Sequence, residues 1–390
     1  MKRTVFDWTW KGLLLAAVIA ASATAEEPAP PSGEYIFKSR TEGYNTFRIP
    51  AIVATPKGTL LAFTEGRKNG PSDGGDIDIV MKRSTDKGKT WSPLEVVWND
   101  GENACSNPCP VVVSKTGRVV LLGVRKPGRI GENDIMKGRV SPDERCRPFT
   151  LKSDDDGKTW QAPQEITASA DRDNWLWYVT GPGNGIELHH GPHAGRLLIP
   201  CNHSTYEYGQ ATYNAHTIYS DDHGETWQIS RTEIAPGANE STVAELSDGS
   251  VIFNCRMQKH GIGQRGEAVS HDGGETWTGF RNDGPLKCPT CEASLISVEF
   301  VPKDSKERRS ALMFSNPQGR GRTNLTIQMS MNNGKSWEWK LPIEPGLSYG
   351  YSSLTHIPGG GFGILFEGPQ DPSGGILWRT FDIHDFVINK

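Results

Sequence analysis

Short apolar segments recur along the chain, and each follows a stretch rich in glycine or charge. Six of them read KGTLLAFTE (57–65), TGRVVLLGV (116–124), AGRLLIPCN (194–202), DGSVIFNCR (248–256), RRSALMFSN (308–316) and GGGFGILFE (359–367). Their length and their content of Val, Ile, Leu and Phe are typical of β-strands. No long stretch with the 3.6-residue apolar period of a helix occurs outside the N-terminal segment. The pattern therefore predicts an all-β chain.

An octapeptide of the form S-x-D-x-G-x-T-W follows five of these strands. The copies are STDKGKTW (84–91), SDDDGKTW (153–160), SDDHGETW (220–227), SHDGGETW (270–277) and SMNNGKSW (330–337). The Asp or Asn can bond nearby backbone N–H groups, the Gly accepts a positive φ, and the Trp can pack the turn down. The aspartates could also form a metal-binding or acidic cluster, but their fixed position in each repeat favours a structural role in a turn.

Strand and octapeptide together repeat at roughly 50 to 70 residues, a period typical of propeller blades. We therefore predict a six-bladed β-propeller with blades of four antiparallel strands. In an up-and-down blade, the start of the first strand, the end of the second and the loop between the second and third share one rim, while the octapeptide turns lie on the opposite rim. Seven polar residues are predicted to share the first rim: Arg48, Asp73, Glu240, Arg256, Arg322, Tyr351 and Glu367.

The N-terminus has the pattern of a secretory signal, with basic residues before an apolar run from Gly12 to Ala21 and small residues up to Ala25. An uncleaved anchor is the alternative, but the run is shorter than the roughly 20 residues that span a bilayer. We expect a signal peptide over 1–25, a linker over 26–38 and the propeller over 39–390. The mature chain should be secreted or periplasmic and have no membrane span.

Composition and charge exclude some classes of protein. Hydrophobic residues make up 35% of the 390 residues, and the 44 glycines raise the apolar fraction further. This composition is typical of a globular protein and not of a disordered one. Lys+Arg 42 nearly balances Asp+Glu 46, and no basic run suggests a nucleic-acid partner. Any function that depends on charge must therefore rest on a few charged residues at one site.

The cysteine count is seven, an odd number for an exported chain, so at least one thiol is free or pairs between chains. Cys105 and Cys109, together with Cys288 and Cys291, could form a four-thiolate zinc site. The two pairs are far apart in sequence and have no histidine at ligand spacing, which favours local disulfides or buried thiols. We expect no metal and no cofactor.

The segment F-R-I-P (47–50), the five octapeptides, known as Asp boxes, and the ordered rim residues closely resemble the exo-α-sialidases (neuraminidases), in particular their secreted bacterial branch. The resemblance covers nearly the whole chain after the signal segment. Asp boxes alone also occur in unrelated propellers, and it is their combination with FRIP and ILFE that is specific.

The resemblance implies that an arginine triad binds the carboxylate of sialic acid, at the matching positions Arg48, Arg256 and Arg322. Three guanidinium groups offer bidentate, charge-assisted hydrogen bonds that lysines would match poorly. Glu367 matches the glutamate that holds the first arginine in place. Each arginine has a surface ion pair as its alternative role, and Arg320 competes for the third position.

The family also implies a tyrosine nucleophile, since sialidases depart from the usual pair of carboxylates. Tyr351 matches the nucleophile and Glu240 matches its base. Asp73 matches the acid/base that protonates the leaving oxygen and later activates water. Asp76 and Asp78 compete for this role, although Asp78 alternates with apolar residues and is expected to be structural.

The segment NWLWYVTGPGNGIEL (174–188) resembles the family stretch that lines the glycerol and N-acyl side of the pocket. Trp177 and Tyr178 are candidates for substrate contact there, with packing inside the propeller as the alternative. The resemblance implies an enzyme that hydrolyses terminal α-ketosidically linked sialic acids from glycans, glycoproteins or glycolipids with retention. We expect the protein to be a monomer. A Kdn-preferring hydrolase, a trans-sialidase and a non-catalytic glycan-binding propeller are the alternatives.

Overall fold

The computed structural model describes residues 33–258, 263–302, 306–369 and 374–388. The predicted signal peptide lies outside these residues, as does the predicted linker up to residue 32. The rest of that linker is partly strand: β1 (Glu34–Lys38) pairs with β25 (Gly375–Phe381) near the C-terminus. Its Ile36 and Phe37 are buried, which explains why this segment joins the sheet.

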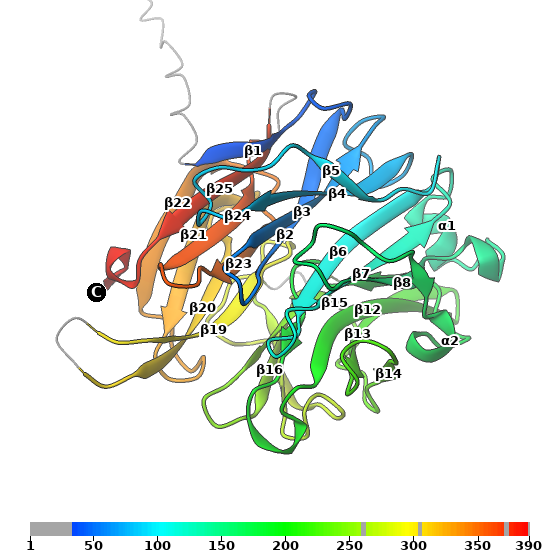
Figure 1. The fold of residues 1–390 in the computed structure, drawn as a ribbon. Coiled ribbons are helices and arrows are strands. Elements are labelled where there is room, and N and C mark those ends of the chain that lie inside the picture. The colour runs from blue at the N-terminus through cyan, green and yellow to red at the C-terminus, as the bar shows by residue number, and fades with distance from the viewer. Residues whose placement is uncertain (1–32, 259–262, 303–305, 370–373, 389–390) are drawn as a thin grey trace, which may run out of the picture. The chain divides into compact units, whose positions relative to one another are not determined.

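The described residues form an all-β propeller, as predicted, in which antiparallel sheets follow one another around a centre (Figure 1). One sheet has the order β1-β25-β24-β23, with β24 (Phe362–Glu367) and β23 (Ser352–His356). A second contains β10 (Tyr178–Thr180), β11 (Ile186–Glu187), β12 (Leu197–Glu207), β13 (Gln210–Ser220) and β14 (Gln228–Ile229). A third contains β15 (Ala238–Glu245), β16 (Val251–Met257), β17 (Gly266–Ser270) and β18 (Thr278–Arg281). A fourth contains β19 (Ser294–Phe300), β20 (Arg309–Pro317), β21 (Thr323–Ser330), β22 (Trp339–Leu347) and β26 (Val387–Ile388).

The remaining sheet is larger than the sequence predicted. It contains β2 (Thr46–Ala54), β3 (Leu60–Arg67), β4 (Ile77–Ser84), β5 (Glu95–Trp98), β6 (Ala104–Val112), β7 (Val119–Lys126), β8 (Arg147–Ser153) and β9 (Gln164–Glu165). Four sheets have the size of a blade and the fifth has eight strands, so the prediction of six separate four-stranded blades is wrong. The reason is one parallel pair, Ile77 with Ala104, which joins β4 to β6 and so merges two runs of four strands into one sheet.

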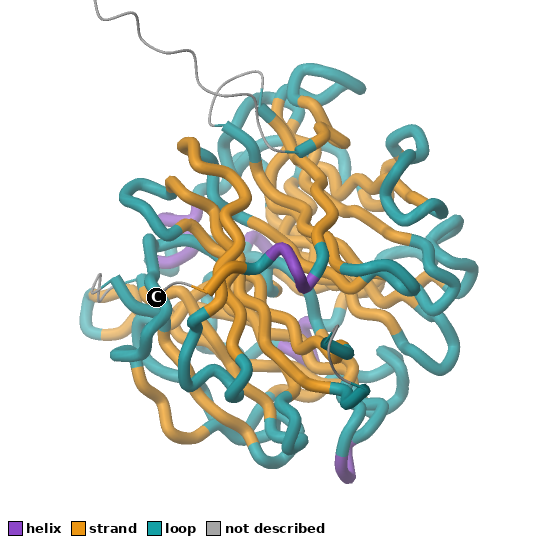
Figure 2. The backbone as a smooth tube through the Cα atoms, turned by 90° about the vertical axis from the view of Figure 1, so that its left-hand side faces the viewer, coloured by secondary structure: helices purple, strands orange, loops and turns teal. Residues whose placement is uncertain are grey.

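The innermost strands contact one another in a closed ring. Strand β2 contacts β6 and β23, β11 contacts β6 and β15, and β19 contacts β15 and β23. Among the described residues, helices occur only in short connections between strands (Figure 2). They are α1 (Glu132–Met136), α2 (Thr167–Ala170) and three 3₁₀ turns, at Pro142–Glu144, Gly191–His193 and Ile383–Asp385. None of the helices in the described segments has the length and hydrophobicity of a membrane-spanning helix.

The octapeptides follow the ends of β4, β8, β13, β17 and β21, and they make the hydrogen bonds expected of turns. In the second copy, Asp155 accepts from the Thr159 backbone N–H (2.9 Å) and hydroxyl (2.6 Å), and the Ser153 hydroxyl accepts from Gly157 N (2.9 Å). Trp160 then packs edge-on against Phe63 from another part of the sheet. The motif therefore stabilises a turn and does not form an acidic cluster.

The seven cysteines are all buried and unpaired. Among the described residues no group of three or more His, Cys, Asp or Glu side chains is arranged to hold a metal ion. Neither local disulfides nor a thiolate zinc site is present there, and of the alternatives weighed from the sequence, buried thiols describe these cysteines.

Candidate functional site

A pocket of about 210 Å³ opens at the strand ends opposite the octapeptide turns. Seven of the predicted residues line it: Arg48, Asp73, Trp177, Glu240, Arg256, Arg322 and Tyr351. They come from strands and loops of five different sheets. Strand direction predicted that six of them share a rim, and the family resemblance predicted Trp177.

Arg48 is held from behind by Glu367. The Glu367 carboxylate accepts hydrogen bonds from Arg48 Nε (2.9 Å) and Nη2 (3.2 Å), from Ile49 N (3.1 Å) and from Tyr351 N (3.0 Å). Ile49 has a φ of +64°, and the pairing of β2 with β3 shifts between Arg48 and Ala51. Such a bulge re-aims a side chain at the end of a strand. Although burial by itself would lower the pKa of Arg48, the Glu367 charge outweighs it and the pKa is raised.

Glu240, Arg256 and Tyr351 form a second group of contacts. The Tyr351 hydroxyl donates to Glu240 Oε1, while Arg256 Nη1 lies 2.7 Å from Glu240 Oε2 and 3.2 Å from the Tyr351 oxygen. Burial, reinforced by the Glu240 charge, raises the pKa of Tyr351 well above its usual value. The phenol is therefore protonated at neutral pH and is hydrogen-bonded to a carboxylate that can accept its proton.

Arg322 completes the cationic wall of the pocket. Its guanidinium donates to the carbonyl oxygens of Tyr349 (2.7 Å) and Thr290 (2.8 Å) and lies 5.5 Å from the Tyr351 ring centroid. Within the described residues it forms no ion pair. Arg320, the competing candidate, is exposed and does not line the pocket.

Asp73 lies at the open side of the pocket with its side chain 72% exposed. Its Oδ1 is 2.8 Å from Arg67 Nη2 and 3.9 Å from Arg48 Nη1. Desolvation would raise the pKa of Asp73, but the charges of Arg67 and Arg48 outweigh it, so the pKa is lowered. The competitor Asp78 is buried, accepting from Tyr44 Oη (2.6 Å) and Asn99 Nδ2, and Asp76 pairs with a lysine outside the pocket.

Trp177 and Tyr178 are neighbours in sequence but have different surroundings. Trp177 lines the pocket, whereas Tyr178 is 0% exposed and packs near Trp175 and His216. The expectation that Tyr178 contacts substrate is therefore wrong, and packing inside the propeller is its role. Trp177 precedes β10, which begins at Tyr178, so the two neighbours lie in different backbone conformations.

Several pocket residues were not predicted from the sequence. Glu65 and Arg67 end β3, where the same strand-direction argument would have found them. Glu132 begins α1 in a loop, and Tyr213 lies on β13 and donates a hydrogen bond to it. Burial raises the pKa of Glu132. No sequence signal marked this pair, because the path of the α1 loop depends on tertiary packing.

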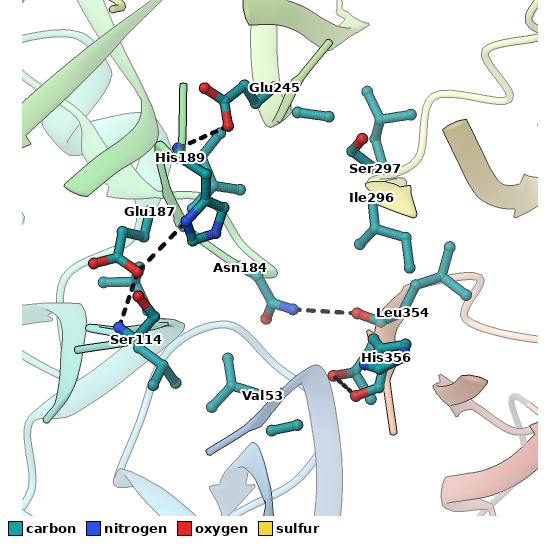
Figure 3. A pocket seen from close by; sticks show the side chains of 18 of the residues that line it. Val53, Ser114, Asn184, Glu187, His189, Glu245, Ile296, Ser297, Leu354 and His356 are labelled. Atoms are coloured by element: carbon teal, nitrogen blue, oxygen red, sulfur yellow. Dashed lines mark hydrogen bonds and ion pairs between the residues drawn. The ribbon is translucent and has the colours of Figure 1, made fainter. Parts of the chain in front are cut away.

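A larger cavity of about 760 Å³ lies at the opposite ends of the strands (Figure 3). Its Glu245 carboxylate accepts from the backbone N–H groups of His189 (2.8 Å) and His190 (2.9 Å), and Glu187 accepts from Ser114 N (2.9 Å). These acceptors are bonded to the protein's own backbone, which is a structural arrangement. None of the rim residues predicted from the sequence lines this cavity.

Comparisons with known proteins indicate the family of the whole chain. The family profile described as a BNR repeat-like domain matches residues 58–364. The chain is 34% identical over 387 residues to a sialidase of Micromonospora viridifaciens, covering 95% of this chain and 58% of that protein. A sialidase of Clostridium perfringens is 32% identical, covering 88% of this chain and 91% of that protein. The solved structure of a Hadza microbial sialidase, Hz136, has a TM-score of 0.78 at 31% identity and covers 88% of this chain and 67% of that one.

The chain thus spans 58% of the length of the first of these relatives and 91% of the second. The BNR profile covers most of the propeller, and similarity to sialidases extends over nearly all of the described residues. The chain belongs to the sialidase family.

Proposed function

We propose that the chain is an exo-α-sialidase that removes terminal sialic acids joined to glycans by an α-ketosidic bond. The observation that supports this most directly is the unused donor capacity of the arginines. Within the described residues Arg322 has only carbonyl acceptors, and the buried Arg256 Nε has no hydrogen-bond partner. A substrate carboxylate lying between these groups and Arg48 would receive charge-assisted hydrogen bonds from all three.

The hydrogen bond from Tyr351 to Glu240 supports a tyrosine nucleophile. A carboxylate nucleophile would be repelled by the substrate's own carboxylate, by roughly 1–4 kcal/mol at contact distance depending on the local dielectric. A protonated phenol has no such repulsion. As Tyr351 Oη bonds to the anomeric carbon, its proton passes to Glu240, and Arg256 stabilises the oxygen that loses it.

Asp73 would act as the acid in the same step. The glycosidic C–O bond breaks as Asp73 donates a proton to the leaving oxygen. Water then attacks the anomeric carbon and gives a proton to Asp73, while the bond to Tyr351 Oη breaks and Glu240 returns its proton to the phenol. Two displacements at one carbon give retention. The two arginines that lower the pKa of Asp73 keep it ionised in the free protein. A substrate carboxylate on Arg48 would offset one of these charges and raise that pKa, so that the acid is protonated when it is needed.

The natural substrates would be sialylated glycans, glycoproteins or glycolipids. We also propose that the N-terminal segment exports the chain to the periplasm or the medium, where such glycans occur. A monomeric state and independence of cofactors stay predictions. Transfer to a sugar acceptor and a preference for Kdn would use the same residues, and substrate assays separate them.

The test is turnover of aryl α-ketosides of N-acetylneuraminic acid and of Kdn, with proton NMR of the sugar first formed. We expect hydrolysis with retention, and labelling of Tyr351 by a 3-fluorosialyl fluoride. Tyr351→Phe should fold normally yet lose turnover by several orders of magnitude. Tyr44→Phe is the control, because it removes a buried phenol that bonds Asp78 outside the pocket and should keep turnover. Inversion of configuration, or a label on Asp73 or Glu240, would overturn the mechanism.

A further inference from the structure

The hairpin of β12 and β13 ends in an unusual turn. The two strands pair without interruption from Leu197 with Ser220 up to Glu207 with Gln210, so that only Tyr208 and Gly209 form the turn (green in Figure 1). Both have positive φ, +51° and +78°. Two-residue turns of this kind favour Asn-Gly, since both positions need a left-handed backbone.

Tyr208 is a poor residue for such a turn. A bulky side chain with positive φ is disfavoured, and such outliers gather at functional sites. Tyr208 is 102% exposed, and its phenol has no bonding partner among the described residues, so no contact within the chain compensates for this conformation. Its neighbour Tyr206, 42% exposed, adds a second aromatic ring to the hairpin.

The hairpin connects the second and third main strands of its sheet, as do the loops that carry Asp73 and Arg322, so its tip lies on the rim of the pocket. Tyr213 on β13 lines the pocket. Because Tyr206 pairs with Ala211, two residues before Tyr213, the side chains of Tyr206 and Tyr213 project from the same face of the hairpin. The tip is roughly 10 Å along the strand from Tyr213, so it lies farther along the rim than the pocket wall that Tyr213 forms.

We propose that Tyr206 and Tyr208 contact the sugars that precede the terminal sialic acid in the substrate. This inference rests on the proposed sialidase function. A tyrosine ring offers an apolar face to the C–H groups of a sugar and a hydroxyl to its polar groups, and it loses little conformational entropy on binding. The occupant is a glycan because the hairpin continues the wall of a glycan pocket. Two rings on a narrow tip are also too small a surface for a stable protein interface, which needs about 800 Å² on each partner.

The test compares kcat/KM for an aryl sialoside, which lacks these sugars, with kcat/KM for sialyllactose and a longer sialylated oligosaccharide. Tyr208→Asn is the informative variant, because Asn suits the turn and the fold should become more stable. We expect Tyr208→Asn to lower kcat/KM for the oligosaccharides by roughly three- to tenfold and to leave the aryl sialoside unchanged. Tyr208→Phe should retain most of the effect of the ring.

Phe280→Thr is the control, since it removes an exposed aromatic ring from β18, whose residues do not line the pocket. It should leave both kinds of substrate unaffected. An unchanged ratio of the two kcat/KM values in Tyr208→Asn would overturn the inference while leaving the sialidase function intact. If the wild-type protein fails to cleave the aryl sialoside, the proposed function falls, and this inference falls with it.

Discussion

Glu367 offers the sharpest test of how the pocket is held together. It is 1% exposed, and all four of its hydrogen-bond partners are donors. Oε1 accepts from Arg48 Nε and Ile49 N, and Oε2 accepts from Arg48 Nη2 and Tyr351 N. Glu367→Gln keeps the shape of the side chain but replaces one oxygen with an NH₂ group. Whichever way the amide is turned, that group faces two donors.

The expected cost follows from these contacts. The substitution loses one hydrogen bond to a charged group and one to a backbone N–H, and it leaves the buried Arg48 without its carboxylate. Together these effects should lower the free energy of unfolding by about 3–5 kcal/mol. The same carboxylate positions both Arg48 and the backbone of Tyr351, so kcat/KM for an aryl sialoside should also fall, by about a hundredfold or more.

Urea unfolding and initial-rate assays measure the two effects. Glu267→Gln is the matched control, because Glu267 is also buried and bonds Arg281 (2.6 Å) but lies outside the pocket. That variant should lose stability and keep kcat/KM. The reasoning is refuted if Glu367→Gln unfolds within about 1 kcal/mol of the wild type, or if it retains full kcat/KM while folded.

Three further predictions concern the arginines, the turns and pH. Arg256→Lys should keep the fold and cost roughly 2–4 kcal/mol of transition-state stabilisation, read from kcat/KM, and a near-wild-type value would remove Arg256 from the carboxylate site. Asp155→Ala should lower the free energy of unfolding by about 1–2 kcal/mol, because the hydrogen bonds to Thr159 are lost, and it should leave kcat nearly unchanged. A variant that is stable but inactive would contradict a purely structural role for this turn. The pKa of Asp73 is lowered in the free protein and should rise when a substrate carboxylate offsets the charge of Arg48. The alkaline fall of kcat should therefore lie at higher pH than the alkaline fall of kcat/KM. Coincident pH profiles would argue against this coupling.

Much of the candidate site followed from one property of strands, namely that alternate strands of a blade run in opposite directions. Whether a residue begins or ends a strand then decides its rim, and seven residues were placed together in this way before any contact was known. The octapeptides were equally local, because Asp155 needs only residues within four positions to satisfy its carboxylate. Such features depend on short-range geometry, which the order of residues specifies directly.

The tertiary structure decided what short-range geometry cannot. Tyr178 and Trp177 are adjacent in sequence, and only the packing of the blade determined which of them faces the pocket. Glu132 reaches the pocket through a loop, and a single pair between Ile77 and Ala104 merged two predicted blades into one sheet. Glu367 contacts Arg48 across 319 positions of sequence. Contacts of this kind arise from the closure of the whole ring, where burial and charge pairing between distant segments fix side-chain positions that no local pattern encodes.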